Sequence, residues 1–271
     1  MDEFRDVSVV RLRDGVRTTD RDLAATEEPL EIRLHGRAFA VVMRTPGADR
    51  ELAAGFLFSE RVLTGADDLA AIERCPHPSA EHPDNILDVT LAGGREAALD
   101  ELLSHRRQVM TNASCGMCGR LTIEAVRADT PAIDSRIGVA AATLGALPSR
   151  LREAQGVFDR TGGLHAAGLF TADGGLEDAA EDIGRHNAVD KVIGRRLLGR
   201  ALPLSDRLLC VSGRTSFEIV QKAALAGIPV VAAVSAPTTL AIDLAAHVGV
   251  TLVGFVRDGG FNVYTHPARV R

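Results

Sequence analysis

Three short apolar segments near the end of the chain decide the fold: residues 208–213 read LLCVSG, 229–235 read PVVAAVS and 251–256 read TLVGFV. They begin 21 and 22 residues apart, and amphipathic stretches at 216–226 and 238–247 separate them. Short continuous apolar runs are typical of strands that are buried on both faces, and the intervening stretches have helical periodicity. The pattern predicts a βαβαβ unit with a parallel sheet, and hence an α/β fold.

The sequence before this unit predicts a smaller α+β part. Alternation of apolar and polar residues at 30–34, a turn at 35–37 and a second run at 38–43 predict a β-hairpin. Asp49 is placed to cap a helix, residues 86–91 have the composition of a strand, and residues 97–103 that of a short helix.

The chain therefore divides into three predicted segments. Residues 1–28 are rich in charge and are expected to be a polar tail, with at most one edge strand around Val7–Leu12. Residues 29–140 form the small α+β domain, and residues 141–271 form the α/β domain.

Composition excludes several classes of protein. The chain has 271 residues, 31 basic against 36 acidic side chains and a net charge of -5, which argues against general nucleic-acid binding. Its longest apolar runs are about ten residues, too short to span a membrane, and residues 1–6 do not resemble a signal peptide. We therefore expect a cytoplasmic protein with reduced thiols. Only two of the basic residues, Lys191 and Lys222, are lysines. Arginine suits anion recognition, although a GC-rich genome gives the same bias.

Two turns carry hydroxyl groups where predicted strands meet predicted helices. They are Ser212-Gly213-Arg214-Thr215-Ser216 and Ser235-Ala236-Pro237-Thr238-Thr239. Free backbone N–H groups and the helix dipole at such positions attract phosphate, and ligands of α/β sheets bind at the carboxyl ends of strands. Simple helix capping by Ser and Thr is the alternative.

The segment 111–120, TNASCGMCGR, holds Cys115 and Cys118 in a glycine-rich Cys-x-x-Cys motif. Nearby arginines favour the thiolate form, so dithiol redox chemistry, metal ligation and persulfide carriage all remain open. Structural zinc normally needs four protein ligands, and the remaining cysteines, Cys75 and Cys210, are isolated. We therefore predict no metal site.

Three further segments are rich in chemically active side chains. His165 follows Gly162-Gly163-Leu164, but a zinc deaminase needs His-x-Glu, and position 167 is Ala. In the segment 181–191, helical spacing of the apolar residues would place Asp182, Arg185 and His186 on one face, toward either a pocket or solvent. The segment 261–267 alone predicts an edge strand that stops at Pro267.

Taken together, these segments resemble the FdhD family of formate dehydrogenase accessory sulfurtransferases over about Glu28 to Arg269. Only Arg61, where the family usually has Gly, departs from the pattern, and it affects a helix end. The blocks that carry the resemblance are EPL (28–30), GFLFSE (55–60), SCGMCG (114–119), GGLHAA (162–167), EDIGRHNAVDK (181–191), SGRTSFE (212–218), GFVR (254–257) and FNVYTH (261–266).

The resemblance implies a fold and a function. It implies a homodimer in which a three-layer α/β/α part with a mixed, largely parallel sheet, like that of cytidine deaminases, follows the small α+β part. It also implies that Cys115 carries sulfur as a persulfide, with Cys118 as a helper. The donor would be a cysteine desulfurase, and the acceptor the molybdenum or tungsten bis(molybdopterin guanine dinucleotide) cofactor of formate dehydrogenase.

The cofactor-binding residues come from two sources. The resemblance assigns Phe261, Asn262, Val263, Tyr264, Thr265 and His266. From the two hydroxyl-rich turns and the segments around them we add Ser212, Gly213, Arg214, Thr215, Arg185 and His165 as candidates. A non-catalytic cofactor chaperone and a zinc-dependent hydrolase on the same scaffold remain alternatives.

Overall fold

The computed structural model describes residues 2–74, 82–93, 130–257 and 259–271. Cys75, Cys115, Cys118 and the predicted helix at 97–103 lie outside these ranges. Within them, no helix is long and apolar enough to cross a membrane.

A six-stranded mixed sheet forms the centre of the larger part, in the order β12-β11-β10-β9-β7-β8. Strands β9, β10 and β11 are parallel, as the three apolar runs predict, and β7 and β12 pair with them antiparallel. The α/β fold is thus confirmed. The strands are β7 (His165–Thr171), β8 (Leu176–Asp182), β9 (Arg207–Val211), β10 (Val230–Ala233), β11 (Thr251–Arg257) and β12 (Gly260–Val263).

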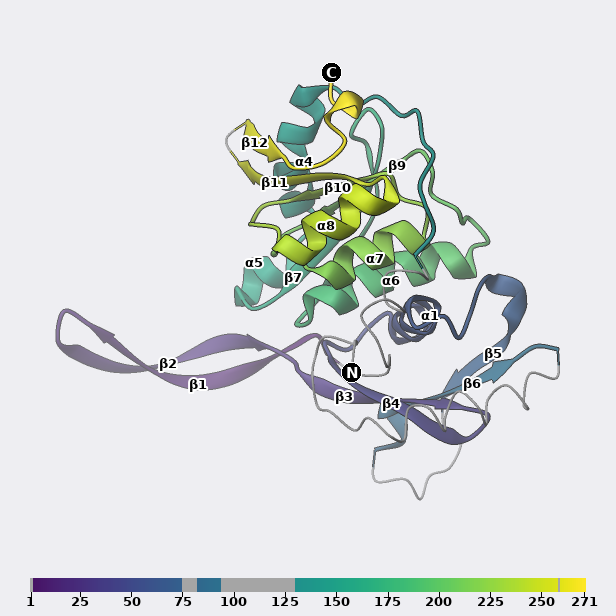
Figure 1. The fold of residues 1–271 in the computed structure, drawn as a ribbon. Helices are drawn as coiled ribbons and strands as arrows, with labels where there is room; N and C mark the ends of the chain where they lie inside the picture. The colour runs from purple at the N-terminus through teal and green to yellow at the C-terminus, as the bar shows by residue number, and fades with distance from the viewer. Residues whose placement is uncertain (1, 75–81, 94–129, 258) are drawn as a thin grey trace.

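Helices cover both faces of this sheet (Figure 1). On one face, α4 (Ala141–Glu153) packs on a cluster that includes Phe170 and Cys210, and α5 (Gly156–Thr161) leads from α4 into β7. The other face carries α6 (Arg185–Leu198), α7 (Phe217–Leu225) and α8 (Thr239–Val248). This three-layer α/β/α arrangement agrees with the expected one. A short 3-10 helix, η3 (Pro267–Arg269), follows β12.

The smaller part is a four-stranded sheet covered by one helix. Its order is β4-β3-β6-β5, and α1 (Asp49–Ser59) lies between this sheet and α6 (Figure 1). The predicted hairpin and the strand at 86–91 are confirmed, and β5 is a strand that the sequence pattern did not predict. The strands are β3 (Glu28–Leu34), β4 (Arg37–Arg44), β5 (Leu69–Arg74) and β6 (Ile86–Leu91), with 3-10 turns η1 (Ala66–Asp68) and η2 (Pro83–Asn85).

The ends of α1 differ from expectation in one respect. Asp49 does not cap the helix: Ala48 is the N-cap residue, and the Asp49 carboxylate instead pairs with the buried Arg44 guanidinium at 2.9 Å. Leaving the buried Arg44 guanidinium without a charged partner costs more free energy than leaving the helix N-terminus without a side-chain cap, so Asp49 pairs with Arg44. After Glu60, Arg61 has φ 63°, the left-handed conformation that glycine adopts most easily.

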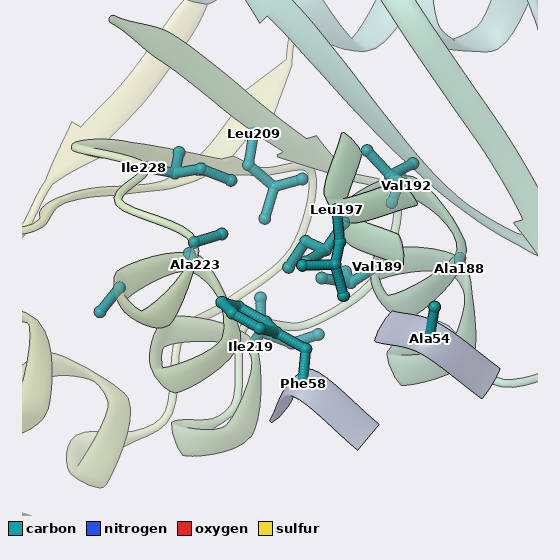
Figure 2. Close-up of a cluster of buried hydrophobic side chains, with 14 of the residues drawn as sticks. Ala54, Phe58, Ala188, Val189, Val192, Leu197, Leu209, Ile219, Ala223 and Ile228 are labelled. Carbon is teal, nitrogen blue, oxygen red and sulfur yellow. The ribbon is translucent and has the colours of Figure 1, made fainter. Parts of the chain in front are cut away.

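Helices α1 and α6 cross at two glycines. A Cβ atom on Gly55 would overlap the backbone carbonyl of Asp190, and one on Gly194 would overlap that of Glu51. Figure 2 shows the apolar cluster beside this crossing, with Phe58 of α1 pointing toward Ile219 of α7. One continuous core contains residues of both sheets, so the two parts share a single interior.

The first residues do not form the polar tail expected from their charge. Strands β1 (Phe4–Arg13) and β2 (Val16–Ala25) pair over their whole length as an antiparallel arm that projects from the molecule (Figure 1). Its base is held where the Arg160 guanidinium lies 3.8 Å from the centre of the Phe4 ring. The expected single edge strand is therefore half of a hairpin.

Candidate functional site at the carboxyl ends of the central strands

The two hydroxyl-rich turns lie side by side, as their positions after neighbouring parallel strands predict. The Thr215 N–H donates to the Ala236 carbonyl at 3.2 Å, and the Thr238 N–H donates to the Thr215 carbonyl at 3.0 Å. Thr215 is fully buried, and no described group hydrogen-bonds to its hydroxyl. In the second turn, the Thr238 hydroxyl accepts from the Ala241 N–H and caps α8, so simple capping is correct there.

The first turn packs against β7 and the start of α6. The Ser212 hydroxyl accepts a hydrogen bond from the Ala166 N–H at 2.8 Å. A Cβ on Gly213 would lie 3.3 Å from His165 Nδ1 and 3.6 Å from Arg185 Cδ, so both side chains flank this glycine. Predicted site residues from three separate segments of the sequence thus meet at one end of the sheet.

Positive charge at this place comes from arginine and not from histidine. Burial, and then the Arg185 guanidinium, lower the pKa of His165, with Asp182 opposing them, so the ring is neutral at pH 7. Arg185 Nε is buried and makes no hydrogen bond to the described residues. Arg214 is exposed. Arg214 and the Nε–H group of Arg185 are therefore available to an anion.

Asp182 does not share a helix face with Arg185 and His186, contrary to the expectation from spacing. It is the last residue of β8, fully buried, and its carboxylate lies 2.8 Å from Lys191 Nζ. It also accepts hydrogen bonds from the Thr45 and Gly184 N–H groups. The strand ends at this residue, three positions before α6 begins, so helical periodicity does not apply to it.

A chain of polar contacts that the sequence did not predict runs from α7 to α6. Ser216 Oγ lies 3.0 Å from His186 Nε2, and His186 Nδ1 lies 3.2 Å from Glu218 Oε2. Behind them, Lys222 Nζ is 2.8 Å from both carboxylate oxygens of Asp190. All except Ser216 are buried. The sequence did hold one signal for these contacts, since Lys191 and Lys222 are the only lysines of the chain. In the structure both pair with buried carboxylates.

The segment 261–266 is divided between the two faces and two ends of the sheet. Phe261 and Val263 pack on the side of α4, whereas the Tyr264 ring lies near Pro237 in the second turn. The Thr265 hydroxyl accepts a hydrogen bond from the Leu252 N–H and donates one to the Val250 carbonyl at the beginning of β11. The two remaining residues are exposed: Asn262 lies on β12, and His266 lies at the end of β11 opposite the turns.

The structure thus brings together His165, Arg185, Gly213 and Thr215, with Ser212 at the edge of the group and Arg214 exposed beside it. Tyr264 joins the second turn, whereas Thr265 and His266 do not. Among the described residues no cluster of three metal-ligating side chains occurs. Cys210 is buried, as expected of a core residue, and burial raises the pKa of its thiol to about 12.

Comparison with known proteins identifies the family. The model of the FdhD/NarQ family matches residues 25–271. The chain belongs to this family. It is 51% identical over 271 residues to the sulfur carrier protein FdhD of Streptomyces avermitilis, covering 97% of this chain and 94% of that protein. It is 52% identical to the protein of the same name from Streptomyces coelicolor, with the same coverage.

A solved structure supports the fold of this FdhD/NarQ member over its whole length. A protein from Desulfotalea psychrophila, provisionally assigned as a formate dehydrogenase accessory protein, superimposes with a TM-score of 0.78 at 27% identity, and each chain is covered completely. The resemblance inferred from the motifs is therefore confirmed for the family and for the α/β fold.

Proposed function

We propose that this protein carries sulfur, as a persulfide on Cys115, from a cysteine desulfurase to the bis(molybdopterin guanine dinucleotide) cofactor that formate dehydrogenase requires. The observation that carries the proposal is the 51% identity, over almost the full chain, to a protein named sulfur carrier protein FdhD. The same relatives, together with the accessory protein from Desulfotalea psychrophila, support a role in formate dehydrogenase maturation.

The burial of Cys210 and the sequence around the other cysteines indicate which thiol carries the sulfur. Cys210 has a pKa of about 12 because it is buried, so its thiolate is scarce at neutral pH and it is a poor nucleophile. Of the other three cysteines, only Cys115 and Cys118 lie in a Cys-x-x-Cys motif with an arginine two residues beyond it. These two residues are the proposed reactive pair.

The proposed loading step is a thiol–persulfide exchange. The Cys115 thiolate attacks the outer sulfur of the donor persulfide, the donor S–S bond breaks, and the donor cysteine leaves as a thiolate. No external oxidant or reductant is needed. Delivery as sulfide requires two electrons. The Cys118 thiolate supplies them by attacking Cys115 Sγ, which closes a Cys115–Cys118 disulfide and releases the outer sulfur to the acceptor.

The carboxyl ends of the central strands suit the acceptor. Its pyrophosphates need hydrogen-bond donors and positive charge, which Arg185, Arg214 and the free N–H groups at the start of α7 supply. Strand β12, which leads to Tyr264, is three strands from β9, so a ligand that contacts both turns and β12 extends across roughly 14 Å. A dinucleotide has that length and a single phosphate does not.

Mass spectrometry tests the carrier directly. After incubation with a cysteine desulfurase and cysteine, we expect the protein to gain one sulfur atom, mapped to Cys115. Cys115→Ala should abolish the gain, Cys118→Ala should load but fail to release sulfide, and Cys75→Ala is the matched control that should behave as the parent. Loading of the Cys115→Ala protein with sulfur would contradict the proposal. If the Cys115→Ala variant restored formate dehydrogenase activity in a host that lacks the wild-type protein, the chaperone alternative would be favoured.

Guanosine diphosphate is the probe for the acceptor site. Arg185→Ala and Arg214→Ala should each weaken its binding about tenfold, since a charge-assisted hydrogen bond contributes roughly 1.5 kcal/mol. Arg17→Ala, which removes an exposed arginine of the arm, should leave binding unchanged. Equal binding by all three variants would contradict the placement of the site.

The family resemblance also predicts a cytoplasmic homodimer. Light scattering of the purified protein should then give twice the chain mass of 28.7 kDa. A mass equal to one chain would contradict the dimer.

A further inference from the structure

Ser216, His186 and Glu218 form a connected line from a half-buried hydroxyl to a buried carboxylate. Ser216 Oγ lies 3.0 Å from His186 Nε2, within hydrogen-bond distance, whereas His186 Nδ1 lies 3.2 Å from Glu218 Oε2 as an ion-pair contact, because Glu218 Oε2 accepts no hydrogen bond from the described residues. His186 is 7% exposed and Glu218 is 9% exposed, so Ser216 is the member of the line that reaches the surface. A hydroxyl, an imidazole and a carboxylate in this order are able to pass a proton along the line.

Comparison of the two turns shows that the arrangement at Ser216 is unusual for its position. Ser216 and Thr238 are the N-cap residues of α7 and α8, and both have extended backbone conformations. Thr238 caps its helix, whereas the Ser216 side chain makes no capping hydrogen bond and is directed to His186 instead. The first N–H groups of α7 therefore remain open to a ligand. The Thr215 hydroxyl in the same turn, fully buried and without a hydrogen bond to any described residue, adds an unpartnered polar group next to them.

The surroundings of Glu218 allow it to hold a proton near neutral pH. Burial raises the pKa of Glu218 to about 7, Lys222 opposes this effect, and the negative charges of Asp190 and Glu60 add to it. Lys222 Nζ pairs with Asp190 at 2.8 Å and with Glu218 Oε1 at 3.3 Å, and Asp190 also accepts from the Ser59 hydroxyl. The charged groups around the line thus come from α6, α7 and the end of α1.

We propose that Glu218 and His186 form a proton relay that ends at Ser216 and supplies one proton when a phosphate ester binds at the N-terminus of α7. The identity of the ligand rests on the proposed function. Above pH 7, where Glu218 is ionised before binding, one proton is taken up from solvent when the dianion binds and is held on His186, which then pairs with the Glu218 carboxylate. Below pH 7 the proton is already on Glu218 and moves to His186 without net uptake. The His186 Nε2–H group donates to Ser216 Oγ, and the Ser216 hydroxyl donates its own hydrogen to a phosphate oxygen. Ser216 contacts the ligand, and Glu218 is a positioning residue.

Calorimetry with guanosine diphosphate measures this proton directly, because buffers of different ionisation enthalpy report protons taken up on binding. The wild-type protein should take up close to one proton above pH 7 and little below it, and its dissociation constant should rise by up to about tenfold per pH unit above pH 7. Glu218→Gln should abolish the uptake and flatten the pH profile. Glu153→Gln, an exposed residue at the end of α4, is the matched control and should retain both.

Ser216→Ala keeps the result interpretable if the Glu218 variant folds poorly, because it leaves the buried ion pairs intact. It should weaken binding and remove most of the pH dependence, whereas loss of a merely structural hydroxyl would weaken binding equally at all pH values. Binding by the wild type without proton uptake, or unchanged uptake in Glu218→Gln, would overturn the relay. Absence of guanosine diphosphate binding would also overturn it, but persulfide loading of Cys115 would still stand.

Discussion

Two regions join the first 60 residues to the rest of the molecule in opposite ways. At the junction of α1, α6 and α7, backbones touch through Gly55 and Gly194, and ionised groups such as Lys222 and Asp190 are almost fully buried. In the arm formed by β1 and β2, the side chains of the ion pair between Arg11 and Asp20 are 37% and 55% exposed. An ion pair at the junction is therefore expected to affect stability much more than an ion pair in the arm, because solvent screens the charges of the arm and not those of the junction.

The largest effect should come from breaking the buried pair. Lys222→Met leaves the Asp190 carboxyl buried without its main partner, which should lower the free energy of unfolding by about 3–5 kcal/mol. Denaturant titration measures the change. Combining it with Asp190→Leu should recover part of the loss, since only Glu218, which Lys222 also pairs with at 3.3 Å, then lacks a cationic partner. A single-variant loss below about 1 kcal/mol, the range of an exposed pair, would remove the distinction between the two regions.

The second effect tests the close approach of the helices. Gly55→Ala places a methyl group where the Asp190 carbonyl lies, so we expect a loss of about 3 kcal/mol in unfolding free energy. Gly156→Ala is the control, because a Cβ there meets nothing within 4 Å. If both variants have the same midpoint of unfolding, the two helices do not touch in this way.

The third effect is a pH dependence that only the junction should show. Burial raises the pKa of Glu218 from 4.5 to about 7, so between these values the folded state keeps a proton that the unfolded chain has released. The free energy of unfolding should therefore fall as pH rises from 4.5 to 7, by no more than about 3 kcal/mol. Titrations at several pH values should show a steeper fall for the wild type than for Glu218→Gln. Parallel curves would contradict the assignment.

The smallest effect should be found in the arm. Arg11→Ala removes contacts with Asp20 and Asp22, yet we expect the free energy of unfolding to change by less than about 0.5 kcal/mol. Leu12→Ser, at a side chain that is 70% exposed, should be equally mild. A loss of unfolding free energy above about 1.5 kcal/mol in either variant would mean that the arm is covered in solution. The arm would then not differ from the junction in its exposure to solvent.

Much of the fold followed from the sequence because it rests on local patterns. Continuous apolar runs separated by amphipathic stretches predicted β9, α7, β10, α8 and β11, and alternation predicted β3 and β4. The arm was missed because its strands are mostly polar, and β5 because it lies beside a proline-rich segment. Asp49 was misassigned because a capping preference of about 1 kcal/mol gives way to the pairing of a buried arginine.

The candidate site was predictable in kind but not in arrangement. Hydroxyl-rich turns after parallel strands indicated an anion site, since the carboxyl ends of parallel strands meet at one edge of a sheet. Glycine-rich spacing around Cys115 and Cys118 indicated reactive thiols, but the structure does not describe them. No local pattern relates Ser216 to His186, which lies 30 residues earlier and on another helix.

By itself, the sequence determined the family, the alternation of strands and helices and the location of hydroxyl groups at helix starts, and it predicted a reactive thiol pair. All of these depend on the identity and spacing of neighbouring residues. Only the tertiary structure decided that His165, Arg185 and Gly213 meet, that Thr265 is structural, and that Glu218 is buried beside His186 with a pKa near neutrality. Those properties arise from desolvation and from contacts between distant segments, which exist only after the helices have packed on the sheet.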